Sequence, residues 1–177
     1  MPTPCRPAAT SIESACRDAF EPLDSCHRET LRMLAEFERL VARIDAAGVD
    51  AQARDLASRI DRYFSEDFKQ HHLDEESKVF PLLADSADAQ TLQAVARLKQ
   101  DHEWLRADWR LLSPLVRAVA SGQSWVDADV LRDGATVFST LARDHIALEE
   151  SLIYPQARTW MLEASRREAR LALAARR

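Results

Sequence analysis

The chain contains one short phrase twice, as HHLDEESKVFP from His71 and as HIALEESLIYP from His145. Each copy has a histidine, a glutamate four residues later, then Glu-Ser and a proline after apolar residues. Four residues are close to one helical turn, so each histidine and its glutamate project from the same face of a helix. Each copy therefore offers two potential metal ligands side by side, which predicts a site assembled in the shared core of two distant helices.

The composition favours an all-α protein. The chain has 177 residues, enough for one domain with its own core. It has only 3 glycines, whereas alanine, leucine, arginine and glutamate are plentiful. The formal net charge of -5 gives no basis for nucleic-acid binding. No segment has the apolar length of a signal peptide or a membrane span, so we expect a cytoplasmic protein without a membrane partner.

Apolar periodicity predicts four long helices, over residues 23–47, 50–83, 90–121 and 127–154. A short helix is expected over 11–20, before Pro22. This pattern divides the chain into an N-terminal arm (1–22), a bundle (23–157) and a C-terminal helical tail (158–177).

Each of the four helices carries one histidine on its apolar stripe. These residues are His27, His71, His102 and His145. At about 100° per residue, Glu75 also falls on the stripe of His71, and Glu149 on that of His145. By the same count His72 lies about 100° away and Glu76 about 140° away, towards the edge of the stripe or solvent.

Burying four imidazoles and two carboxylates without compensation would be costly, which predicts a cation among them. No arginine or lysine falls centrally on the histidine stripes, so a metal is favoured over a bundle with only polar pairs. The set exceeds the four ligands of a closed zinc site and suits two ions. If Glu75 and Glu149 bridge, each ion receives two imidazoles and two carboxylate oxygens. Nitrogen and oxygen donors with open positions indicate iron, with manganese or zinc as alternatives.

This layout resembles the hemerythrin-like, or HHE cation-binding, domains over about residues 23–156. The shared features are a histidine early in helix one, His-x-x-x-Glu phrases before Phe-Pro or Tyr-Pro in helices two and four, and a histidine in helix three. The resemblance implies an up-down-up-down antiparallel four-helix bundle that holds two iron ions joined by an oxo or hydroxo bridge. The ligands that it implies are His27, His71, Glu75, His102, His145 and Glu149. Some relatives use a ligand near His72, but its angular offset favours a position outside the coordination spheres.

One position departs from the oxygen-carrying members of this family. They have a second histidine one turn after the helix-three histidine, where this chain has Arg106. The departure predicts an additional open or water-filled position, unless His72 moves in, and argues against reversible oxygen storage. We expect Arg106 to face solvent or to pair with Asp101 or Glu103.

Two functions agree with these features. The first is a non-catalytic di-iron module that binds or senses oxygen, nitric oxide or peroxide and transmits strain to the arm or tail. The alternative is an iron-handling or iron-sulfur cluster repair protein, or a di-iron oxidase or peroxidase with Tyr63, Tyr154 or Trp104 as redox or proton partners. Cys26, next to His27, either tunes such a centre or is a simple half-buried thiol. A homo-oligomer is compatible with either function.

Overall fold

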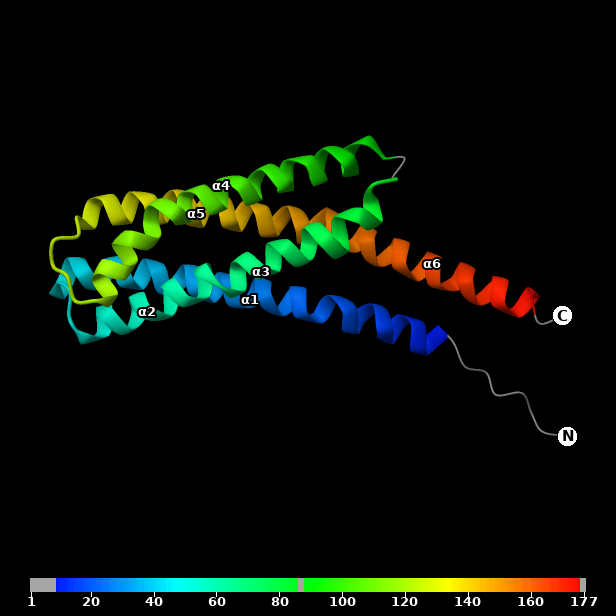
Figure 1. Ribbon diagram of the computed structural model, residues 1–177, viewed down its shortest axis with the longest axis horizontal. Coiled ribbons are helices and arrows are strands. Elements are labelled where there is room, and N and C mark those ends of the chain that lie inside the picture. Colours follow the sequence, from blue (N-terminus) through cyan, green and yellow to red (C-terminus); the bar gives the residue numbers. More distant parts are fainter. Residues whose placement is uncertain (1–8, 86–87, 176–177) are drawn as a thin grey trace, which may run out of the picture.

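The computed structural model describes residues 9–85 and 88–175, and every regular element in this part of the chain is helical (Figure 1). The elements are α1 (Ala9–Ala47), α2 (Ala51–Ser65), α3 (Asp67–Asp74), the π-helical turn η1 (Glu75–Val79), the 3-10 turn η2 (Phe80–Leu83), α4 (Ala89–Ala120), α5 (Ala128–Leu148), the π-helical turn η3 (Glu149–Ile153) and α6 (Tyr154–Ala174). None of the described helices is long and apolar enough to cross a membrane.

These elements form four antiparallel rods, which confirms the all-α four-helix bundle (Figure 1). The rods are α1, then α2 with α3, then α4, and finally α5 with α6. Around the bundle, α1 packs against α2 and α5, and α4 packs against the same two helices. The N- and C-terminal ends of the described chain lie at the same end of the molecule (Figure 1).

Caps and glycines fix where the rods begin and end. The side chains of Asp50, Asp88 and Asp127 accept hydrogen bonds from the first free backbone N–H groups of α2, α4 and α5. Gly48 (φ 70°) follows α1 and Gly122 (φ 79°) follows α4, both in the left-handed region that favours glycine. The predicted starts and ends of the rods at these turns are therefore close to those observed.

Three helix boundaries differ from the predictions. First, α1 runs continuously through Pro22 instead of ending before it. An interior proline costs about 3 kcal/mol, but Phe20 and Leu23 on either side are buried, which offsets that cost. Second, the rod predicted over 50–83 breaks at Glu66, where φ is -118° and ψ is -76°.

The third difference lies at Pro155, where the last rod continues into α6 instead of ending. Proline is tolerated in the first turn of a helix, because an N–H group there has no partner within the helix. The division into arm, bundle and tail stays a prediction, and continuous helices cross both of its boundaries.

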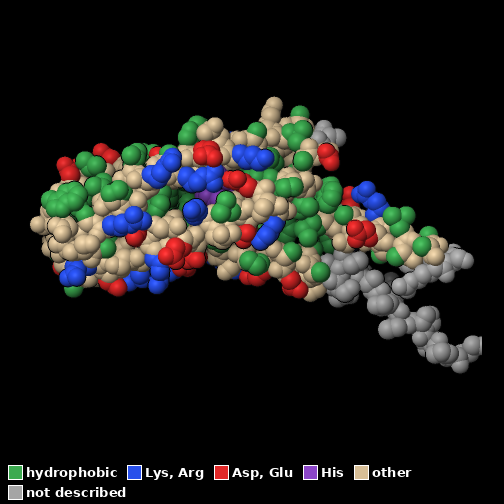
Figure 2. All heavy atoms as spheres, viewed as in Figure 1, with side chains coloured by type: hydrophobic (Ala, Val, Ile, Leu, Met, Phe, Trp, Pro, Cys, Tyr) green, Lys and Arg blue, Asp and Glu red, His purple; other side chains and the backbone are tan. Residues whose placement is uncertain are grey.

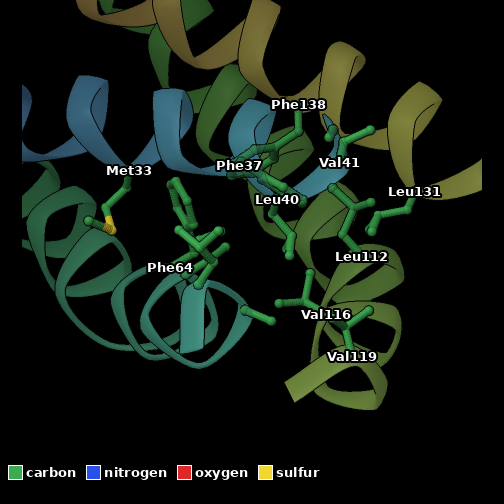
Figure 3. Packing of buried hydrophobic residues seen from close by; sticks show 14 of the residues in the cluster. Met33, Phe37, Leu40, Val41, Phe64, Leu112, Val116, Val119, Leu131 and Phe138 are labelled. Carbon is green, nitrogen blue, oxygen red and sulfur yellow. The ribbon is translucent and has the colours of Figure 1, made fainter. Parts of the chain in front are cut away.

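Two apolar clusters fill the bundle, and a polar layer separates them. The larger cluster packs aromatic side chains from all four rods; Phe37, Phe64 and Phe138 are labelled in Figure 3, and Trp109 of α4 joins them. The smaller cluster lies towards the chain termini and includes Phe20 and Tyr154. On each rod, the predicted ligands lie between residues of one cluster and residues of the other, so the candidate site is enclosed on both sides.

Candidate metal centre

The polar layer brings together all six predicted ligands and His72. Each of these side chains is at most 5% exposed. They are His27 of α1, His71 and His72 of α3, Glu75 of η1, His102 of α4, His145 of α5 and Glu149 of η3. Residues from all four rods therefore meet in one water-excluded layer.

Both copies of the doubled phrase contain a π-helical turn at the same place. The N–H of Phe80 bonds to the carbonyl of Glu75, and the N–H of Tyr154 bonds to the carbonyl of Glu149, each five residues earlier. A proline follows in each copy, and its ring would clash with the carbonyl four residues before it. The wider turn begins at the glutamate in both cases, and such turns often occur at functional sites.

Each of the two glutamates faces histidines from opposite sides of the layer. Glu75 Oε1 lies 3.4 Å from His71 Nε2 and 3.9 Å from His27 Nε2, while its Oε2 lies 3.4 Å from His102 Nε2. Glu149 Oε2 lies 3.2 Å from His27 Nε2, and its Oε1 lies 3.2 Å from His145 Nε2. Both carboxylates thus span the distance between two sets of imidazoles.

The donor atoms fall into two groups of four, and within each group they lie within 4.8 Å of one another. One group is His72, Glu75, His102 and His145, and the other is His27, His71, Glu75 and Glu149. The shared Glu75 joins the groups. The arrangement has the spacing of two adjacent cation sites.

The angular count placed His72 towards the edge of the stripe or solvent, but the structure places its side chain inside this layer. His72 is 1% exposed, and its ring stacks on that of His102 with centroids 4.0 Å apart. Because α3 is enclosed by neighbouring rods on both sides, the buried part of its surface spans more than 100° around the helix axis. Glu75 projects between His71, which faces α1, and His72, which faces α4. An angular count from one residue could not reveal how wide the buried arc is.

Arg106 occupies the position where oxygen carriers have a second histidine. Its guanidinium lies 2.7 Å from Glu103, as expected, and 3.4 Å from Glu76. The imidazole of His72 adjoins His102, so it lies on the side of the layer where the missing histidine was expected. The sequence alone did not decide whether His72 takes this place.

Carboxylates also hold the outer nitrogens of two histidines by hydrogen bonds and approach that of a third, a feature that the sequence reading missed. His102 Nδ1 donates to Glu76 at 2.7 Å, and His27 Nδ1 donates to Glu150 at 3.1 Å. Asp101 Oδ2 lies 3.8 Å from His145 Nδ1. Metal-binding histidines commonly donate their other N–H to such a group, which fixes the tautomer and the ring orientation. The signal was present, since Glu76 and Glu150 occupy the same position in the two copies of the phrase.

One of the three aromatic candidates reaches the site. The Tyr154 hydroxyl donates to Glu75 Oε1 at 2.5 Å and lies 3.2 Å from His27 Nε2, with its ring stacked on that of His27. Tyr63 instead bonds to Thr30, at 2.7 Å. Trp104 is 53% exposed. Tyr154 is therefore the phenol that touches the candidate centre.

The Cys26 thiol lies beside the layer, 3.3 Å from the Tyr63 hydroxyl. Burial raises its pKa, and the hydrogen bonds from Tyr63 and Thr30 only partly oppose this effect. A protonated, half-buried thiol agrees with the simpler of the two roles considered for it.

Unpaired polar atoms indicate that the layer fits a metal. In the described residues, eight buried side-chain nitrogen or oxygen atoms have no hydrogen-bond partner, and seven of them belong to His71, His72, Glu75, His145 and Glu149. An unpaired buried polar group costs about 1–3 kcal/mol. A bound cation would satisfy the inward-facing atoms, and the donors are all nitrogen and oxygen, which suits iron, manganese or zinc.

Without a metal, the layer is electrostatically strained. Burial lowers the pKa of His71 to about 4 and holds that of His72 well below its usual value. Burial also opposes the charge on His27, but the carboxylates of Glu149 and Glu75 raise its pKa to about 9. Burial and the neighbouring Glu75 raise the pKa of Glu149. The metal-free layer therefore favours the protonated forms of His27 and Glu149, and a metal bound there would compete with those protons.

Comparison with known proteins agrees with this geometry. The chain is 29% identical over 135 residues to an uncharacterized protein of Haemophilus influenzae, a match that covers 76% of each chain. It is 25% identical over 132 residues to a protein of Pectobacterium atrosepticum named iron-sulfur cluster repair protein YtfE. That match covers 74% of this chain and 59% of the relative. The model of the hemerythrin HHE cation binding domain matches residues 18–157. The chain therefore belongs to the hemerythrin HHE cation-binding family.

Proposed function

We propose that this protein binds two iron ions and uses them to bind or sense oxygen, nitric oxide or peroxide, without turning over a substrate. The observation that carries the proposal is the pair of donor groups joined by Glu75 in a buried layer. Two cations at adjacent sites would neutralise the carboxylates and satisfy the unpaired oxygens of Glu75 and Glu149. When bound, iron would supply open positions for a small ligand and a change of oxidation state.

The residues divide between the two ions. His72, His102 and His145 would hold one ion, and His27 and His71 the other, with Glu75 and Glu149 as shared carboxylates. The first donor group would then supply three imidazoles to its ion and the second group two. The ion on the side with fewer imidazoles would have more positions open to a small ligand. We infer that the small ligand binds on the side of His27 and His71.

Tyr154 lies on that same side, since its hydroxyl contacts both Glu75 and His27 Nε2. A phenol at this position can donate a hydrogen bond to a bound ligand or give it a proton. The apolar cluster of Phe20, Phe80 and Ile153 adjoins Tyr154 and excludes water from this end of the layer. Tyr154 would therefore stabilise a polar ligand in an otherwise dry site.

Ligand binding at this side could be transmitted to the chain termini. His27 lies on α1, and Tyr154 is the first residue of α6. Beyond the layer, Arg158 of α6 pairs with Asp24 of α1 at 2.6 Å, and its guanidinium lies 4.9 Å from the centre of the Phe20 ring. A shift of His27 against Tyr154 would act directly on this pair of helices, which supports a sensing role.

The second candidate is an iron-handling or cluster-repair role, or oxidase or peroxidase activity. The relative named as an iron-sulfur cluster repair protein supports the repair role, although the match spans only 59% of that protein. The phenol of Tyr154 beside the carboxylates supports the oxidase or peroxidase role. Release of iron to an apo iron-sulfur protein, or sustained consumption of peroxide, would favour these activities over binding alone.

Two measurements test the main proposal. Elemental analysis of protein produced in iron-rich medium should find about two iron ions per chain, and Glu75→Gln should lose most of both because it belongs to both groups. Adding oxygen or nitric oxide to the reduced protein should then change the visible absorption spectrum in a stoichiometric, saturable way. A wild-type protein that retains no metal, or a spectrum that does not respond to any of the ligands, would refute the proposal.

A further inference from the structure

A basic pocket opens between α2–α3 and α4, next to the metal-ligand layer. It has a volume of about 430 Å³, and its rim carries Lys69, Arg106, Arg110 and Arg117. Figure 2 shows Lys and Arg side chains gathered around a spot where a histidine side chain is visible. The volume falls within the range of pockets that hold small organic molecules.

The charge of this pocket contrasts with that of the whole protein. Among the residues that the structure describes, no aspartate or glutamate lines it, although the chain has a net charge of -5. A second groove, which reaches His71, has the opposite character: its described lining includes Glu29, Asp67 and Asp74 and no lysine or arginine. The two faces of α3 therefore present opposite charges, and of these two sites the pocket beside His72 is the one that attracts an anion.

Part of the positive charge at the rim is not neutralised. Arg106 pairs with Glu103, and Arg117 lies 3.0 Å from Asp61, so these two cations are held in place. Among the residues that the structure describes, Lys69 and Arg110 form no ion pair. Two free cations next to two fixed ones can receive a carboxylate without first breaking an existing ion pair.

The floor of the pocket is apolar and aromatic. Phe64, Phe68, Leu105 and Trp109 line it, and each is at most 8% exposed. The Trp109 Nε1–H is already bonded to Ser65 Oγ at 3.1 Å, so Trp109 offers no free donor to a ligand. Such a floor favours a flat apolar group over a hydrated inorganic ion.

His72 connects the pocket with the candidate metal centre. Its ring lines the pocket and also belongs to one of the two donor groups. It is 1% exposed, and neither of its nitrogens has a hydrogen-bond partner. If one nitrogen binds a metal, a molecule in the pocket would contact the ring of a metal ligand.

We propose that this pocket binds an organic anion with a flat apolar body, such as an aryl carboxylate. The carboxylate lies among Lys69, Arg106 and Arg110, and the apolar body lies on Phe68 and Trp109, beside His72. The bound anion is therefore adjacent to the donor group of His72, His102 and His145, on the opposite side of α3 from His71. The inference goes beyond the proposed function, although both share His72.

Calorimetric titration of the protein as purified with 2-naphthoate tests the proposal. We expect one equivalent to bind, with affinity that falls as salt is added, because the rim charges are exposed to screening. The neutral analogue 2-naphthalenemethanol should bind at least about tenfold more weakly, which corresponds to about 1.4 kcal/mol. Inorganic phosphate, which lacks the apolar body, should not compete at equal concentration.

The double variant Lys69→Gln/Arg110→Gln should weaken naphthoate binding at least about tenfold, again about 1.4 kcal/mol. The matched control is Arg132→Gln/Arg143→Gln, because these cations line a different groove together with Glu38 and Asp45. Equal affinity in both double variants, no binding of naphthoate, or equally tight binding of phosphate would overturn the proposal. Elemental analysis of the same sample keeps the two hypotheses apart: normal metal content without naphthoate binding refutes only this inference.

Discussion

The Nδ1–H of His102 donates a hydrogen bond of 2.7 Å to Glu76, the residue directly after the ligand candidate Glu75. The second copy of the phrase repeats this relationship, since Glu150 follows Glu149 and accepts from His27 Nδ1 at 3.1 Å. In each Glu-Glu pair, the first carboxylate thus lies in the layer, and the second accepts a hydrogen bond that orients a histidine from another rod. This shared arrangement explains why both glutamates occur in both copies.

Removing these outer carboxylates should weaken metal binding. Glu76→Ala and Glu150→Ala each leave the inner donors in place but free one imidazole to rotate and make it less basic. We expect a loss of about 10- to 100-fold in metal affinity, the usual range for such changes, measured by competition with a chelator. Both side chains are partly exposed, so thermal stability without metal should change little.

Glu103→Ala is the matched control for these variants. Its carboxylate also forms an ion pair, but the partner is Arg106 of the same helix, α4, and not a histidine. Metal affinity should remain within about twofold of wild type, because an exposed ion pair contributes little. An equal loss in the control would mean that net surface charge, and not imidazole orientation, sets the affinity.

The stoichiometry of metal binding should distinguish the two donor groups. His72→Ala removes a donor from the group with His102 and His145, and leaves the other group intact. We therefore expect the iron content to fall from about two ions per chain towards one. Glu75→Ala, which affects both groups, should reduce it towards zero. Asp74→Asn is the control, because Asp74 is adjacent in sequence but pairs with the exposed Lys78. Unchanged iron content in His72→Ala would exclude His72 as a ligand.

The fold was largely predictable because the signals for it are local. Aspartates at three helix starts and glycines after two helix ends determined the rod ends at those turns to within a few residues. The continuation through Pro22 and Pro155 was not predictable, since it depends on how α1 and α6 pack against each other around Phe20 and Tyr154. Proline weakens a helix locally, but contacts between rods determine whether the helix ends there.

The site was predictable in part for the same physical reason. His71 and Glu75 lie one turn apart on one helix, so sequence spacing was enough to bring them to one face. The position of His72 and the bond from His102 to Glu76 depend on which rods are neighbours, and a helical count contains no such information. These contacts between helices could be found only from the structure.

Removing the Tyr154 hydroxyl should affect ligand binding more than metal binding. Phe80 occupies the matching position of the other copy, so Tyr154→Phe fits the same π-turn and proline context. The variant should keep its iron, while nitric oxide or oxygen should dissociate up to about tenfold faster, since a hydrogen bond contributes about 0.5–1.5 kcal/mol. Stopped-flow absorption would measure the dissociation rate.

Tyr63→Phe is the control for this change. It also removes a buried phenol hydroxyl, but one that is bonded to Thr30 and Cys26 and lies outside the donor groups. Its ligand dissociation rate should match that of wild type. If both variants changed the rate equally, general packing rather than a hydrogen bond at the centre would be responsible.

The stability of the metal-free protein should peak near pH 6.5. The pKa of folded His71 is lowered by burial to about 4, against 6.5 for an ordinary histidine, and that of His72 is also lowered. Above pH 6.5 these histidines are neutral in both the folded and the unfolded chain, so they do not lower the free energy of unfolding. As the pH falls towards 4, the unfolded chain binds protons that the folded chain does not, and the free energy of unfolding decreases. Burial raises the pKa of Glu149, which acts in the opposite sense above 4.5, whereas the pKa of Glu75, which despite burial is lowered by His71 and His102, adds to the loss of stability on the acid side.

Above pH 6.5 the sign reverses because of His27. Burial opposes its charge, but Glu149 and Glu75 raise its pKa to about 9, so its contribution is complete below 6.5 and is lost as the pH rises through 9. Thermal unfolding across pH 4–9 should therefore give a maximum for the metal-free protein, and His27→Gln should flatten its alkaline side. Metal-loaded protein should lack the alkaline decline, because a His27 ligated through Nε2 is already neutral and loses no imidazolium proton as the pH rises through 9. The same alkaline decline in loaded protein would show that His27 does not bind the metal.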